Sequence, residues 1–521
     1  MSSLFRITII VLTLCVIAGC AGNNYPDNVN NSLKAAGDNK AELEQVITHY
    51  QTTGDSLKLE AAYFLIGNME EHCYVTYRLF DTSDATVEFD PMSFPDYKAL
   101  LVAIDSIESD RGELDYGKLD KIMDVEVIKA DFLINHIDLA FRAWKDKPWA
   151  KNLTFKNFCR YVLPYRGSNE PLEDWRSYFM EKYNDIDDKL DDDKDPVNVA
   201  SVINDDVRAW FGFDERYYFH PTDQGLSEML DSKLGRCEDM TNITIFALRA
   251  NGLAVTSDYT PHWANTGNNH AWNAILTEDG TVIPFMGAEA NPGHYRLHNK
   301  AAKVYRKTYD QQPDNLVFQP NKQEKMPRWL AGKYYIDVTN DYMDAIDAVI
   351  DVTESIPDSI DIAYICVFNS GKFRPINWGR IEDGKVTFAD MGTGILYIAA
   401  TYQNKEVVTF GEPFVLEDNG VISYKSISPD THTSLSIDNI PMRAMATSTE
   451  TVKHTPLASG VTYELKYWHG SEWTEFSTYT PKSKTISVSD LPAGGLYWLT
   501  AQDSKNDERI FTIEANKQIF W

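Results

Sequence analysis

The periodicity of the chain changes from helical to strand-like near Pro327, and this change constrains the fold most strongly. Before it, apolar residues recur every three or four positions in Ala41–Met69 and in Val125–Trp144, as in amphipathic helices. After it come short β-rich runs separated by turn residues, namely Lys333–Val338, Ile362–Phe368, Lys385–Ala389, Gly394–Tyr402 and Val407–Val415. We therefore expect helical segments first and small β-sandwich-like modules last.

Two segments of the β-rich part resemble each other. YICVFNSGKFRPINWG, from Tyr364, is followed by DMGTGILYIAAT from Asp390. YELKYWHGSEWTEFST, from Tyr463, is followed by DLPAGGLYWLTA from Asp490. Chance similarity among β-rich sequences is the alternative, but the shared order predicts two related modules, at residues 327–430 and 431–521.

The N-terminal segment has the pattern of an export signal. Met1–Arg6 carries one cation, Ile7–Ile17 is almost wholly apolar, and Ala18-Gly19-Cys20 follows. The apolar run is too short for a membrane-spanning helix, which needs about 20 residues. Ile17–Cys20 resembles the bacterial lipobox, which implies cleavage before Cys20 and lipidation of that cysteine. We predict a lipoprotein signal peptide at residues 1–19 and a polar tether at 20–40. The mature protein would then be anchored by lipid in the cell envelope, at the outer membrane or cell surface. A simple secretory signal is the alternative.

Charge and cysteine content exclude several classes of function. The 521 residues include 77 Asp and Glu against 49 Lys and Arg, for a net charge of −28, which argues against a nucleic-acid partner. The remaining cysteines, apart from Cys15 and Cys20, are Cys73, Cys159, Cys237 and Cys366, and no two are close in sequence. This spacing predicts neither a disulfide framework nor a zinc site, and no residue pattern requires a cofactor. In an exported protein each of these thiols must be buried or functional.

Residues 223–290 carry the chemistry. Ser227–Leu234 predicts a helix that ends at Gly235, and Cys237 begins a second helix that stops at Asn251-Gly252. The partial positive charge of a helix N-terminus stabilises a thiolate. Strands are expected at Leu253–Tyr259 and His270–Leu276, and the second forms a hairpin with Thr281–Phe285. A histidine on such a strand can take the proton of the thiol, although a lone Cys and a lone His are more often structural.

The surrounding residues favour the catalytic interpretation. Gly235-x-Cys237-x-Asp239, then Leu248-Arg249-Ala250-x-Gly252-Leu253, then His270-Ala271-Trp272, resembles the transglutaminase-like superfamily. The resemblance implies a papain-like α+β domain, which we place at residues 151–326, after a helical region at 41–150. That family includes protein cross-linkers, cysteine proteases and glycopeptide amidases. Carried over, Cys237 matches the nucleophile and His270 the base.

The sequence departs from the family at the third catalytic position. An Asp commonly follows the histidine on the next strand, but here that strand reads VIPFMG. Glu289, beyond the strand, is the preferred substitute, and Asp279 in the turn is the alternative. We expect Trp263, Trp272 and Asn273 to line the cleft, although Trp263 could instead cap the core.

These residues predict a cysteine-dependent enzyme that acts on peptide or glycopeptide amides. In this mechanism Cys237 attacks the amide, His270 takes and returns the proton, and water or an amine resolves the thioester. The alternative is a non-catalytic scaffold that binds glycans or proteins. The missing Asp supports this alternative, and so do aromatic residues of the β modules, namely Trp378, Trp468 and Trp473.

Overall fold

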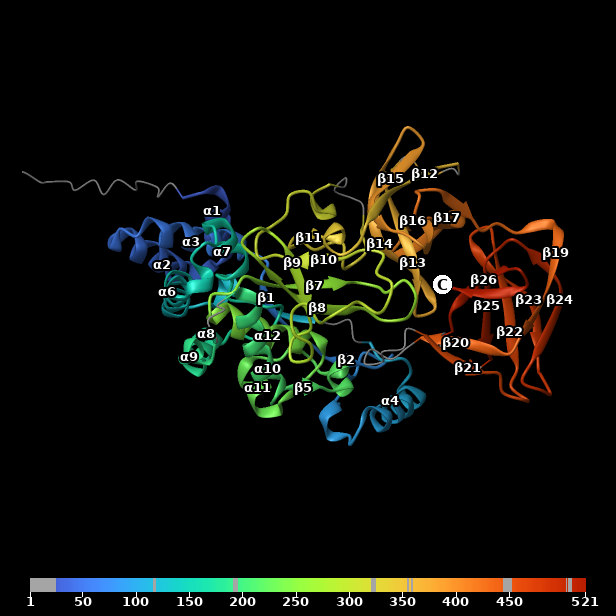
Figure 1. Ribbon diagram of the computed structural model, residues 1–521, viewed down its shortest axis with the longest axis horizontal. Helices are drawn as coiled ribbons and strands as arrows, with labels where there is room; N and C mark the ends of the chain where they lie inside the picture. The colour runs from blue at the N-terminus through green and yellow to red at the C-terminus, as the bar shows by residue number, and fades with distance from the viewer. Residues whose placement is uncertain are drawn as a thin grey trace, which may run out of the picture.

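The computed structural model describes residues 25–521 except 116–118, 191–194, 320–324, 354–355, 358, 444–451, 503 and 505–507. The chain runs from a group of helices at one end, through a mixed α and β domain, to two β modules at the other end (Figure 1). The predicted signal peptide and Cys20 lie outside the described residues. No helix in the described part of the chain is long and apolar enough to cross a membrane.

The N-terminal helices share one apolar core, formed by α1 (Asp27–Ala35), α2 (Lys40–Thr53), α3 (Ser56–Asn68) and α6 (Ala130–Asp146). The predicted tether at residues 20–40 is wrong from Asp27 onward. Val29 and Leu33 lie one helical turn apart and are buried, so this segment packs as α1. The single helical pattern of Ala41–Met69 is two helices, because Gly54 is left-handed (φ 71°) and the Asp55 carboxylate accepts the Lys58 N–H to start α3.

A small mixed unit separates α3 from α6, so the region that we predicted as helical also contains strands. It includes β1 (Cys73–Tyr77) paired antiparallel with β4 (Leu119–Met123), and β2 (Leu79–Phe80) paired with β3 (Thr86–Val87). The helices of this unit are α4 (Tyr97–Arg111) and the short α5 (Asp124–Val127).

The central domain places helices against a five-stranded antiparallel sheet of order β11-β10-β7-β8-β9. Its strands are β7 (Val255–Thr260), β8 (His270–Leu276), β9 (Val282–Phe285), β10 (Tyr305–Lys307) and β11 (Tyr335–Asp337). Its helices are α8 (Trp175–Lys182), α9 (Ile186–Lys189), α10 (Pro196–Arg208), α11 (Leu226–Ser232) and α12 (Cys237–Ala250). Helix α7 (Phe155–Tyr161) lies in the predicted range 151–326, but its buried side chains belong to the N-terminal helical core. The two-residue strands β5 (Gly212–Phe213) and β6 (Leu234–Gly235) form a separate parallel pair.

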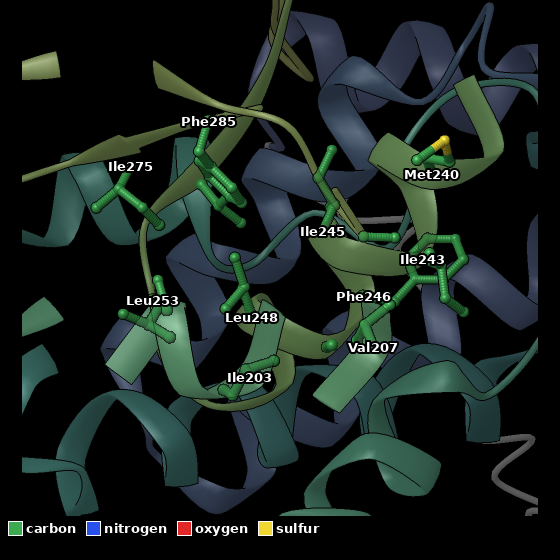
Figure 2. Close-up of a cluster of buried hydrophobic side chains, with 14 of the residues drawn as sticks. Ile203, Val207, Met240, Ile243, Ile245, Phe246, Leu248, Leu253, Ile275 and Phe285 are labelled. Carbon is green, nitrogen blue, oxygen red and sulfur yellow. The ribbon is translucent and has the colours of Figure 1, made fainter. Parts of the chain in front are cut away.

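Helix α12 is the centre of this domain, because it packs against β7 and β8 on one side and α8 and α10 on the other. Figure 2 shows the apolar side chains that meet there, among them Ile203 and Val207 of α10, Ile243, Phe246 and Leu248 of α12, and Ile275 and Phe285 of the sheet. Twelve consecutive residues of α12, Asp239–Ala250, are buried. The residue that begins the helix is therefore held in a fixed position.

Strand β11 shows that the predicted domain boundary at residue 326/327 is wrong. We placed Lys333–Val338 in the first β module, but Tyr335–Asp337 pairs with Tyr305–Lys307 and forms an edge of the central sheet. The sequence of a short segment can predict that it is a strand, but not which strand it pairs with, because strand pairing is a long-range contact.

The first β module begins at β12 and forms a seven-stranded sheet of order β12-β15-β14-β13-β16-β17-β18. Its strands are β12 (Ala345–Asp351), β13 (Ile362–Asn369), β14 (Lys372–Glu382), β15 (Lys385–Gly392), β16 (Ile395–Gln403), β17 (Glu406–Leu416) and β18 (Ile422–Tyr424).

The second module repeats this arrangement, in β19 (Ser428–Ile437), β20 (Asn439–Arg443), β21 (Val452–Pro456), β22 (Tyr463–His469), β23 (Glu472–Tyr479), β24 (Ile486–Ala493), β25 (Tyr497–Ala501), β26 (Ile510–Glu514) and β27 (Lys517–Phe520). The order β23-β22-β25-β26-β27 matches β14-β13-β16-β17-β18, and the pair β19-β24 matches β12-β15. Asp390 and Asp490 are both left-handed at equivalent places (φ 51° and 62°). The predicted pair of related β-sandwich-like modules is confirmed.

Candidate active site

Cys237 is the first residue of α12, as predicted, and the chain around it explains why the helix starts there. A Cβ atom on Gly235 would lie 2.5 Å from Asp239 Cβ and 2.9 Å from Phe211 Cζ, so only glycine allows this close approach. The Asp239 carboxylate, 1% exposed, accepts the backbone N–H groups of Arg236 and Gln224, each at 2.9 Å. These contacts fix the first turn of the helix and place the thiol.

Among the described cysteines, Cys237 differs from the others in its exposure. Cys73, Cys159 and Cys366 are buried, whereas Cys237 is partly exposed. Its side chain lines a cavity of about 420 Å³. Because the other three described cysteines are buried, Cys237 is the candidate for function.

His270, at the start of β8, lines the same cavity. Its ring lies 5.9 Å from that of Trp263 in a stacked arrangement, and its Nε2 is hydrogen-bonded to the Tyr295 hydroxyl at 2.8 Å. No hydrogen bond between Cys237 and His270 is present in the described structure. The fold therefore brings the two predicted catalytic residues to one cavity without joining them directly.

Burial keeps both groups neutral. It raises the pKa of the Cys237 thiol to about 11, with a further contribution from the carboxylate of Glu238, while Arg236 opposes the shift. Burial also lowers the pKa of His270 to about 4. At neutral pH the resting site thus contains a thiol and an uncharged imidazole, not the thiolate–imidazolium ion pair of an activated cysteine.

Tyr295 occupies the place that we assigned to Glu289. Glu289 lines the cavity, and burial raises the pKa of its carboxyl group, but the partner of the His270 ring is the Tyr295 hydroxyl. Burial, followed by the charges of Glu289 and Cys237, raises the pKa of Tyr295, so this hydroxyl stays neutral. No sequence spacing points to Tyr295, because it lies in the loop after β9, 25 positions from His270.

Of the three residues expected to line the cleft, the structure places Trp263 in the cavity wall but not Trp272 or Asn273. Trp272 has no exposed surface and lies one step deeper on β8, where its indole N–H donates to Tyr342 Oη at 3.0 Å. Asn273, also fully buried, donates to the carbonyl oxygens of Thr241 and Thr256. Because both side chains make buried contacts within the domain, the prediction is corrected for these two positions.

A buried ion pair supports the floor of the site. The Asp258 carboxylate accepts from Arg306 Nε and Nη2, each at 2.8 Å, and from the Tyr342 hydroxyl at 2.6 Å. Tyr342 in turn holds Trp272. This network ties β7, β8 and β10 together beneath the histidine.

The loop 261–269 forms one wall of the cavity, and both β modules hold it. Asn369 of β13 donates from Nδ2 to the carbonyl oxygens of Trp263, Thr266 and Asn268, at 2.9, 3.1 and 2.9 Å. Arg509 of the second module donates to the carbonyl oxygens of Ala264 and Thr266, at 2.7 and 3.2 Å. Sequence analysis did not identify either residue, since each acts on a loop more than 100 positions away.

Comparison with known proteins agrees with this geometry. The family model described as the transglutaminase-like superfamily matches residues 184–285, which include Cys237 and His270. The chain contains a transglutaminase-like domain. The matched residues contain α12, β8 and β9.

The crystal structure of red sea bream transglutaminase aligns at 8% sequence identity, over 87% of this chain and 78% of the transglutaminase chain. The TM-score of 0.19 is too low to support a common arrangement. No curated protein sequence matches the chain.

In the described part of the chain, no group of three or more His, Cys, Asp and Glu residues could hold a metal ion.

Proposed function

We propose that the transglutaminase-like domain hydrolyses or transfers the acyl group of a peptide or glycopeptide amide through a thioester on Cys237. The observation that carries this proposal is that the one partly exposed thiol of the described chain shares a cavity with His270. A volume of about 420 Å³ is within the range of small-ligand pockets.

The hydrogen bond to Tyr295 selects the nitrogen of His270 that acts as base. If Nε2–H donates to the Tyr295 hydroxyl oxygen, Nδ1 carries the lone pair and accepts the thiol proton. The sulfur then attacks the amide carbonyl carbon, the C–N bond breaks, and the imidazolium returns the proton to the leaving amine. Water or a second amine releases the acyl group from the thioester.

Two backbone groups support the charged steps. The Cys237 N–H lies in the first turn of α12, where amides have no partner within the helix, and can donate to the developing oxyanion. A backbone hydrogen bond from Ala271 lowers the pKa of the thiol against the larger effect of burial. Because the resting thiol is protonated, proton transfer to His270 must accompany attack.

The chemistry can be tested with p-nitrophenyl acetate, which acylates a nucleophilic cysteine whatever the natural substrate is. Wild type should release p-nitrophenolate and carry an acetyl group on Cys237, detectable by mass spectrometry. Cys237→Ala should abolish both, while Cys159→Ala, which removes a buried thiol, should retain them. Equal turnover by Cys237→Ala and wild type would overturn the proposal.

A non-catalytic binding function is the second candidate, and a specific observation favours it. The histidine has a neutral tyrosine where a carboxylate would stabilise the imidazolium, and burial holds the thiol pKa at about 11. In that case wild type and His270→Ala would be acylated equally slowly.

We also propose that a lipid on Cys20 anchors the protein in the cell envelope, at the outer membrane or cell surface. The apolar run Ile7–Ile17 followed by Ala18-Gly19-Cys20 supports this location. Metabolic labelling with an alkyne-tagged fatty acid should mark wild type and not Cys20→Ala; equal labelling would contradict it.

A further inference from the structure

A groove of about 860 Å³ lies where the two β modules meet the transglutaminase-like domain. The turns of three β-hairpins contribute to it: residues 371–375 after β13, residues 402–409 around the β16–β17 turn, and residues 468–473 around the β22–β23 turn. His262 and the segment Pro327–Trp329 complete its lining. The groove thus exists only when both modules and the central domain are packed together.

The groove is positively charged in a strongly acidic protein. Arg328, Lys372, Arg374 and Lys405 line it, against the single carboxylate of Glu406. None of these four cations has an ion-pair partner among the described residues, although the chain has 77 acidic residues for 49 basic ones. Unpaired cations gathered around one hollow favour an anionic ligand.

Aromatic rings form the rest of the lining. Trp329, Tyr402 and Trp473 are half-buried, so part of each side chain is exposed, while Phe373 and Trp468 are buried and pack edge-to-face at 5.2 Å between ring centroids. Trp473 packs edge-to-face on Trp468 at 5.1 Å, which holds its ring in place. Half-exposed, fixed rings provide flat apolar surfaces for a ligand.

The indole N–H of Trp468, a residue of the groove lining, has no partner among the described residues. Trp468 is 4% exposed, and its Nε1 has no hydrogen-bond partner in the described structure. A buried indole N–H normally donates to an acceptor, so an unpaired one on the lining of a groove calls for an explanation.

We propose that this groove binds an anionic oligosaccharide, a chain of sugar rings that carry carboxylates. Sugar rings present flat C–H faces to Trp329, Tyr402 and Trp473, and their carboxylates can meet the lysine and arginine side chains. An acidic peptide would satisfy the cations, but the side chains of aspartate and glutamate offer little flat apolar surface to three aromatic rings.

The groove and the active-site cavity share a wall. His262 lines the groove and Trp263, the next residue, lines the cavity. Burial, together with the charge of Arg374, lowers the pKa of His262 to about 4, so this histidine adds no charge at neutral pH. Binding in the groove does not depend on the thiol chemistry and should be the same in Cys237→Ala.

Isothermal titration calorimetry on the purified full chain tests the proposal with three probes of matched length: hexagalacturonate, neutral cellohexaose and hexaglutamate. We expect hexagalacturonate to bind at least about tenfold more tightly than the other two. The double variant Lys372→Gln, Lys405→Gln removes two exposed groove cations and should weaken its binding about tenfold. Trp473→Ala should weaken it by a similar factor, through loss of stacking.

The matched control is Lys482→Gln, Lys484→Gln, which removes the same charge from exposed lysines of the second module outside the groove. This control should bind hexagalacturonate like wild type. Equal weakening in the two double variants would show non-specific attraction and overturn the proposal. So would tighter binding of hexaglutamate, which would make the groove a site for acidic peptides, or the absence of binding by hexagalacturonate.

Discussion

Replacing Asn369 by alanine should loosen the cavity wall without unfolding the protein. Asn369 is 2% exposed and ends β13, and its side-chain amide is the contact between the first β module and the carbonyl groups of loop 261–269. The amide has two N–H bonds for three acceptors, so the substitution removes about two full hydrogen bonds to the loop, besides the one that Asn369 Oδ1 accepts from the Ser370 hydroxyl.

The free-energy cost of Asn369→Ala depends on which hydrogen bonds each carbonyl oxygen of the loop retains. Thr266 retains the hydrogen bond from Arg509 at 3.2 Å, while the carbonyl groups of Trp263 and Asn268 lose their bond to the side chain of Asn369. Roughly 1 kcal/mol for each lost bond, and more where a buried carbonyl is left unpaired, gives a cost of about 2–3 kcal/mol. At about 1.4 kcal/mol per factor of ten, local opening of the loop should become roughly 30- to 140-fold more frequent.

Hydrogen exchange of the backbone amides in residues 261–269 measures this opening directly. The matched control is Asn377→Ala in the same module, since Asn377 is 8% exposed and donates to the carbonyl oxygen of Ala389 in the adjacent strand. Both variants should lower the unfolding temperature by a few degrees, but only Asn369→Ala should speed exchange in the loop. Equal exchange rates of the loop in wild type and Asn369→Ala would refute the reasoning.

Three further predictions concern the site and its support. The rate of alkylation of Cys237 by iodoacetamide should rise with pH up to about 10, because a pKa of about 11 leaves little thiolate at neutral pH; a plateau below pH 8 would contradict the effect of burial. Tyr295→Phe should lower kcat for p-nitrophenyl acetate about tenfold, with KM and the unfolding temperature nearly unchanged, because one hydrogen bond that orients His270 is lost; an unchanged kcat would show that Tyr295 does not position the base. Asp258→Asn should lower the free energy of unfolding by roughly 3–5 kcal/mol in urea titrations, since it leaves Arg306 as a buried cation without its main partner. Asp341→Asn is the control and should lower the free energy of unfolding by less than about 1 kcal/mol, because the Asp341 carboxylate is 38% exposed and lies 3.4 Å from Arg306. Equal losses of stability in the two variants would refute the assignment of Asp258 as the main partner of Arg306.

Local sequence signals predicted the elements that carry the site. The helix that begins at Cys237 and the strand that begins at His270 have the predicted starts. These features depend on residues within a few positions of one another, such as Gly235 and the capping carboxylate of Asp239. The paired β modules were also predictable, because a repeat is visible within the sequence itself.

The tertiary structure decided which residues surround the two catalytic candidates. Tyr295 rather than Glu289 contacts His270, Trp272 lies behind the cavity rather than in its wall, and β11 joins the central sheet. Each of these depends on a contact between segments far apart in the chain, which no periodicity or spacing encodes.

The same distinction applies to the active site: the sequence shows which reactive groups are present, and the tertiary structure sets their protonation and holds the cavity wall. The sequence by itself determined that a thiol stands at a helix start and that a histidine begins a strand nearby, because backbone preferences act over a few residues. Only the tertiary structure decided that the thiol and imidazole are both neutral, because burial in the packed domain sets their pKa values. It also decided that Asn369 and Arg509 hold the wall of the site, since hydrogen bonds to a loop 100 or more positions away form only when the modules dock.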